Sequence, residues 1–128
     1  MIVNGLYYTK EHEWIKVTGS VGTVGITDHA QELLGEVTFV ELPPVGKTVK
    51  AGDMVSAVER SKAASDVYAP LAGTVAEVNA ALETSPELIN DSCYDEGWIC
   101  KLNVNDPADV SSLMDAQQYK TYVQEQEQ

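Results

Sequence analysis

The chain has 128 residues, of which 44% are hydrophobic and 22% are charged, a composition typical of globular domains that excludes extensive disorder or a fibrous repeat. Eight basic and 20 acidic residues give a formal net charge of −12. Because this charge repels phosphate backbones and anionic lipid surfaces, we expect binding neither to nucleic acid nor to membranes.

Short runs of alternating apolar and polar residues, separated by turn residues, predict a mainly β fold. Strands are predicted over 13–17, 21–26, 36–42, 54–59, 64–68, 74–78 and 98–104, with a brief strand after Pro44. A short helix is expected to begin at Thr27 or Asp28 and to end at Gly35. A helical turn is expected from Ser85 through Ile89.

The last part of the chain changes character and predicts helices. Asp106 and Pro107 suit a helix start, and Asp115 can start a final helix. The residues that would share one face of the first of these helices are Val110, Leu113, Met114 and Gln117. The residues at helical spacing in the second are Tyr119, Tyr122 and Val123. We therefore expect one domain over 1–128, with a core at about 13–104 and a helical tail at about 106–125.

The cysteines and histidines indicate little chemistry. Cys93 and Cys100 form no CxxC motif and are expected to be buried thiols. His12 and His29 lie beside carboxylates without metal-ligand spacing, and we expect solvated side chains. The sequence contains no phosphate-binding loop, dinucleotide-binding turn or nucleophile elbow, so we expect a protein that is not an enzyme.

One lysine has an unusual predicted position. The strands predicted over 54–59 and 64–68 would form a hairpin with residues 60–63 at its tip, so Lys62 would project into water on a stiff platform. Such a lysine can serve as a handle for a covalently attached acyl arm. From this geometry alone, an ordinary solvated lysine remains the competing interpretation.

The segment from Glu59 to Pro70, ERSKAASDVYAP, followed by Gly73, resembles the lipoyl-lysine hairpin of the glycine cleavage system H protein family. Further similar stretches follow in the family's order: HEW at 12–14, VGITDHAQELLG at 24–35, FVELP at 39–43, SPELIN at 85–90 and YDEGW at 94–98. The resemblance covers nearly the whole chain. It implies a flattened barrel-sandwich hybrid of two packed antiparallel sheets, with short helices and a C-terminal helical tail.

The resemblance also implies roles for individual residues. Lys62 would carry lipoate in an amide linkage, and Glu59 and Gly73 match positions read by lipoate-attaching enzymes. Glu13 and Asp66 match acidic positions that line the cleft for the aminomethyl-loaded arm. Two departures from the family stand out: Arg60 and Ser61 replace its usual Ser and Val, and Cys93 replaces Pro.

The implied function is that of a carrier in glycine cleavage. The partners would be the pyridoxal-phosphate glycine decarboxylase (P protein), the tetrahydrofolate-dependent aminomethyltransferase (T protein), the dihydrolipoyl dehydrogenase (L protein) and a lipoate-attaching enzyme. Three alternatives stay open: an octanoyl or lipoyl donor in a lipoylation relay, a biotin carrier, and an unmodified interaction domain. Because the chain starts at Met1 without a signal or presequence, we expect the bacterial cytoplasm rather than a mature mitochondrial form.

Overall fold

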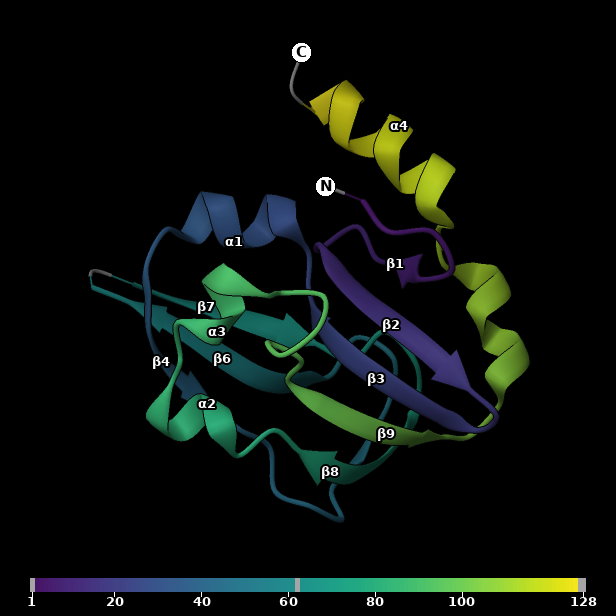
Figure 1. Ribbon diagram of the computed structural model, residues 1–128. Helices are drawn as coiled ribbons and strands as arrows, with labels where there is room; N and C mark the ends of the chain where they lie inside the picture. The colour runs from purple at the N-terminus through teal and green to yellow at the C-terminus, as the bar shows by residue number, and fades with distance from the viewer. Residues whose placement is uncertain (1, 62, 127–128) are drawn as a thin grey trace.

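The computed structural model describes residues 2–61 and 63–126, which form two antiparallel sheets with short helices around them and a C-terminal helix (Figure 1). The larger sheet has the strand order β1 (Tyr7–Tyr8), β2 (Glu13–Thr18), β3 (Val21–Ile26), β9 (Cys100–Val104), β8 (Gly73–Val78) and β5 (Thr48–Val49). The smaller sheet has the order β4 (Val37–Glu41), β6 (Met54–Arg60) and β7 (Ala63–Tyr68). Among the described residues neither strand order closes on itself, so the expected two-sheet fold is confirmed as a pair of open sheets.

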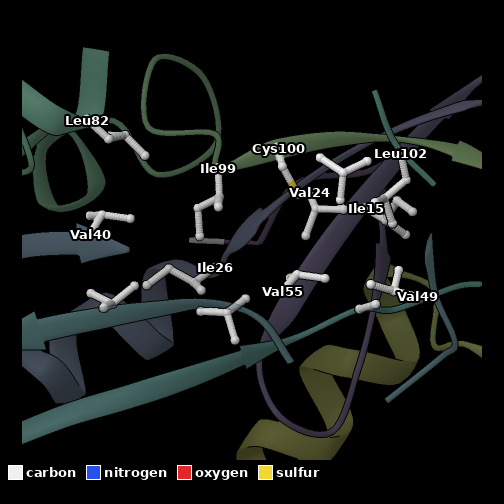
Figure 2. Packing of buried hydrophobic residues seen from close by; sticks show 14 of the residues in the cluster. Ile15, Val24, Ile26, Val40, Val49, Val55, Leu82, Ile99, Cys100 and Leu102 are labelled. Carbon is white, nitrogen blue, oxygen red and sulfur yellow. The ribbon is translucent and has the colours of Figure 1, made fainter. Parts of the chain in front are cut away.

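The hydrophobic core lies between these two sheets. Figure 2 shows Val24, Cys100 and Leu102 of the larger sheet directed toward Val55 of the smaller one. The facing side chains are fully or almost fully buried. This burial fixes which way each strand faces, because a one-residue slip would turn its apolar side chains toward water. Two short helices, α2 (Ala81–Thr84) and α3 (Leu88–Asp91), add Leu82 and Ile89 to the same core.

Helix α1 (Asp28–Leu34) begins and ends where its capping residues predict. The Thr27 side chain accepts a hydrogen bond from the amide of Ala30, and Gly35 adopts a left-handed φ of 72° after the last turn. Both signals are local, which explains why the sequence predicts this helix correctly. No helix in residues 2–61 and 63–126 is both long and apolar enough to cross a lipid bilayer.

The C-terminal region differs from its predicted form. The predicted first helix is a 3₁₀ helix, η1 (Pro107–Ser112), capped by Asp106 as expected. The prediction that Met114 continues its apolar face is wrong, because the chain after η1 is extended and Met114 pairs with Tyr8 in a β-bridge. The final helix, α4 (Ala116–Gln126), starts after Asp115, whose carboxylate accepts a bond from the amide of Gln118 at 2.8 Å.

A second apolar cluster attaches α4 to the sheets. Its buried members are Leu6, Tyr8, Trp14, Tyr119 and Val123. The rings of Tyr8 and Tyr119 stack with centroids 4.5 Å apart and planes within 5°. In Figure 1, α4 lies beside the N-terminal segment and β1, apart from the smaller sheet. The helix therefore packs on the residues that lead into β2.

Candidate functional site

The predicted hairpin is present, and both of its strands are one residue longer at the turn than expected. Strands β6 and β7 pair from Met54 opposite Tyr68 to Arg60 opposite Ala63. The exposed residues Ser61 and Ala63 flank position 62. Lys62 itself lies outside the described residues, so its exposure and its modification stay predictions.

A cavity of about 200 Å³ lies against this hairpin. Its apolar lining includes Ile26 of β3, Leu34 of α1 and Val58 of β6, and its acidic lining includes Glu13 and Asp66. The structure thus brings to one cavity the two carboxylates that the family resemblance pairs. Three parts of the chain build it: the start of β2, the end of β3 with helix α1, and the β6–β7 hairpin.

Glu13 is a buried carboxylate, with 2% of its surface exposed. Its Oε1 accepts a hydrogen bond from the hydroxyl of Thr9 at 2.5 Å, and its Oε2 accepts one from the amide of Tyr68 at 3.1 Å. Burial raises the pKa of Glu13 above its ordinary value of 4.5, and these two hydrogen bonds offset part of that rise. Asp66, by contrast, is exposed to solvent.

The turn before β2 holds Glu13 in place. The amide of Thr9 donates to the carbonyl oxygen of Glu13 at 3.0 Å, and the amide of Glu13 donates to the Thr9 hydroxyl at 3.1 Å. His12 takes a left-handed φ of 68°, which is uncommon for a residue with a side chain and lets the chain enter β2 at once.

The prediction that His12 is a solvated side chain is wrong. Its Nδ1 lies 2.8 Å from the hydroxyl of Tyr119, its ring centroid lies 4.6 Å from that of His29, and the side chain is half-buried. Burial, with a smaller effect of His29, lowers the pKa of His12 below its ordinary value. His29 is also only partly exposed.

The raised pKa of Glu13 predicts a pH-dependent stability. The folded chain holds the Glu13 proton more tightly than the unfolded chain, so the contribution of Glu13 is largest below its ordinary pKa and is lost as the pH rises through the folded-state pKa. In urea titrations, the unfolding free energy of the wild type minus that of Glu13→Gln should therefore fall as the pH rises from below 4.5, the ordinary pKa of Glu13, through its higher folded-state pKa. A pKa for Glu13 at or below 4.5 in an NMR titration would contradict this expectation.

The structure does not bring Glu59 and Gly73 together. Glu59 lies in β6, half-buried, and pairs with Phe39 and Ala64 in the smaller sheet. Gly73 begins β8 in the larger sheet and is buried. A Cβ atom on Gly73 would collide with the backbone carbonyl oxygen of Asn103 on β9. Gly73 therefore has a packing role that the sequence alone does not reveal.

Arg60 has a contact that sequence reasoning missed. Its guanidinium donates hydrogen bonds of 3.3 Å to the carbonyl oxygens of Leu33 and Leu34, the last residues of α1. These carbonyls have no partner within the helix, so a nearby arginine satisfies them. Arg60 thus joins the hairpin to the helix that lines the cavity.

The two cysteines are buried thiols, as predicted. Burial raises the pKa of Cys93 to about 11 and that of Cys100 to about 12, so both are poor nucleophiles at neutral pH. The carbonyl oxygen of Cys93 accepts a bond of 3.0 Å from the Trp14 indole. In residues 2–61 and 63–126, no three His, Cys, Asp or Glu side chains gather as metal ligands would.

Comparison with known proteins identifies the family. The family model described as "Glycine cleavage H-protein" matches residues 6–126. The chain is 50% identical to the glycine cleavage system H protein of Cronobacter sakazakii over 126 residues, which is 98% of both chains. It is 50% identical to that of Thermotoga maritima over 115 residues, which is 90% of this chain and 93% of the relative.

A solved structure agrees with the sequence comparison. The crystal structure of a glycine cleavage system H protein from Mycobacterium marinum matches 99% of this chain and 100% of its own, with a TM-score of 0.85 and 35% identity. The match to the family model and the relatives at half identity cover the hairpin, the cavity and α4 alike. The chain belongs to the glycine cleavage H-protein family.

Proposed function

We propose that this chain is a lipoylated carrier that takes the aminomethyl group of glycine from the glycine decarboxylase and presents it to the aminomethyltransferase. Lys62 holds the lipoyl group in an amide linkage, and the chain has no turnover of its own. The family is a family of lipoyl carriers in glycine cleavage, which supports the general role. The observation that carries the specific proposal is the cavity in which Glu13 and Asp66 meet an apolar wall beside the hairpin.

The residues of the cavity suit a lipoyl arm that ends in a cation. Ile26, Leu34 and Val58 provide an apolar surface for the aliphatic chain. Each oxygen of Glu13 already accepts one hydrogen bond and keeps capacity for another, so the carboxylate can also accept from an ammonium group. When bound, the lipoyl group supplies the sulfur chemistry, accepting the one-carbon unit and returning to its disulfide by dithiol exchange.

The two carboxylates have different tasks in this proposal. Asp66, exposed at the cavity, attracts the cation, and the buried Glu13 holds it by charge-assisted hydrogen bonds. An arm without the cation gains neither interaction. The chain therefore retains the loaded arm and releases the unloaded one, and its apolar wall keeps water from the labile group while it is held.

The remaining assignments of the family are part of the same proposal. The partners are the P, T and L proteins of glycine cleavage and a lipoate-attaching enzyme, for which Glu59 and Gly73 are recognition positions. Residues 1–128 act as one carrier domain. The compartment is the bacterial cytoplasm, and the bacterial origin of relatives at half identity supports this part of the proposal.

A loading experiment tests the function. We expect the intact mass of the chain to rise by one lipoyl group after treatment with a lipoate-attaching enzyme. After exposure to the decarboxylase and glycine it should rise further by an aminomethyl group on one sulfur and a hydrogen on the other. Loss of the aminomethyl group to water should be several-fold faster in Asp66→Asn, because the cavity attracts the cation less strongly and the loaded arm leaves it more often.

The matched control is Glu77→Gln, which removes an exposed carboxylate from β8 in the other sheet and should leave this rate unchanged. Equal rates in wild type and Asp66→Asn would contradict the role of Asp66. A biotinyl increment, or a lipoylated chain that the decarboxylase cannot load, would refute the carrier function. In the second case, transfer of the lipoyl group to other acceptor proteins would identify a relay donor.

A further inference from the structure

Tyr119, in the C-terminal helix α4, lies within hydrogen-bond distance of two residues that belong to different segments around the cavity. Its side chain is fully buried, and it is not among the residues that line the cavity. Its hydroxyl oxygen lies 2.8 Å from Oγ1 of Thr27 and 2.8 Å from Nδ1 of His12. These partners precede it by 92 and 107 residues in the chain.

Each partner of Tyr119 belongs to a different wall. Thr27 caps α1, accepting a bond of 3.2 Å from the amide of Ala30, and α1 forms one wall. His12 lines the cavity just before the start of β2 and directly precedes Glu13. The two walls also meet in one backbone bond, from the amide of Thr27 to the carbonyl oxygen of His12 at 3.0 Å.

The chemistry of a hydroxyl suits this bridge. A tyrosine hydroxyl donates one hydrogen bond and accepts others, so it can satisfy the threonine hydroxyl and the imidazole nitrogen at the same time. The stacked ring of Tyr8 fixes the ring of Tyr119, and the ring of His12 meets it edge-on with centroids 5.8 Å apart. The packing of α4 therefore determines where the bridging hydroxyl lies.

We propose that Tyr119 is a positioning residue that holds the α1 wall and the Glu13 wall of the cavity at a fixed separation, so that the C-terminal helix maintains the site of the loaded arm. This inference rests on the proposed function for the role of the cavity. The bridge itself is a property of the unmodified chain.

Tyr119→Phe tests the bridge, because it removes the hydroxyl and keeps the stacked ring. In hydrogen exchange of the unmodified full-length chain, the amides of Thr27 and Ala30 should exchange about fivefold to tenfold faster, the effect expected for losing about one net hydrogen bond. The amide of Leu102, in the middle of the core strand β9, serves as the reference and should not change. In the loaded chain, release of the aminomethyl group to water should accelerate by a similar factor.

Tyr122→Phe is the matched control. It removes a hydroxyl from the same helix that donates to the carbonyl oxygen of Lys10 at 3.1 Å and accepts from the side chain of Gln126, and neither of these partners lines the cavity. Wild-type exchange at Thr27 and Ala30 in Tyr119→Phe would overturn the inference. An equal effect of Tyr122→Phe, a parallel rise at Leu102, or faster exchange without faster release would overturn it as well. If the wild-type chain cannot be loaded, the proposed function fails. The hydrogen exchange of the unmodified chain still shows whether the Tyr119 hydroxyl stabilises the contact between Thr27 and His12.

Discussion

Lys62→Arg should reduce glycine cleavage in a reconstituted system to the rate measured without this chain. Arginine keeps the positive charge, but its guanidinium stays protonated and does not form the amide that holds a lipoyl group. The fold should be unaffected, because the neighbouring residues Ser61 and Ala63 are exposed. We therefore expect an unchanged intact mass after treatment with the lipoate-attaching enzyme, and a free energy of unfolding within about 0.5 kcal/mol of the wild type.

Lys120→Arg provides the control for this experiment. Lys120 is exposed on α4, and its replacement should leave lipoylation and glycine cleavage at wild-type levels. A lipoyl increment that persists in Lys62→Arg would show that another amine carries the group. Activity that persists without any increment would show that the chain works as an unmodified interaction domain. Either result would remove the basis of the carrier proposal.

Local signals in the sequence predict the elements that frame the site. The hairpin of β6 and β7 is predicted to within one residue at its turn, because alternating strands on both sides of a short connection leave few other registers. Helix α1 is predicted at both ends, because Thr27 and Gly35 act on their nearest neighbours. The family resemblance adds the expectation that Glu13 and Asp66 line the same cleft. No local sequence pattern contains this information, because the two residues are far apart in the chain.

Tertiary contacts account for what the sequence does not predict. The helical spacing around Met114 is overridden by its bridge to Tyr8, since pairing with a distant strand outweighs a weak helical preference. The burial of His12 depends on Tyr119, which is 107 residues away. Likewise, burial raises the pKa of Glu13, and the hydrogen bond that offsets part of this rise comes from the amide of Tyr68, 55 residues away in the other sheet. None of these contacts leaves a periodic trace in the sequence.

Gly73→Ala should lower the free energy of unfolding by about 2–4 kcal/mol, a value typical of overpacking in a core. The added methyl group would meet the carbonyl oxygen of Asn103, and its carbon would lie 3.2 Å from Cα of Val104. Both atoms belong to the backbone of β9, which pairs with β3 on its other side and cannot move away without breaking one of its ladders. Urea denaturation of the unmodified chain measures the loss.

Gly52→Ala is the control that separates the cost of steric crowding from the cost of changing a glycine's backbone conformation. Gly52 has a left-handed φ of 91° with open space where its Cβ would lie, so its replacement should cost only about 1 kcal/mol. An unchanged stability of Gly73→Ala would contradict the packing role.

Because Gly73 is buried, a lipoate-attaching enzyme can sense it only through the backbone around β8. Lipoylation of the folded Gly73→Ala chain should therefore be slower than that of the wild type, because the added methyl group shifts this backbone. A rate that falls only with the unfolded fraction would contradict the proposed recognition role of Gly73.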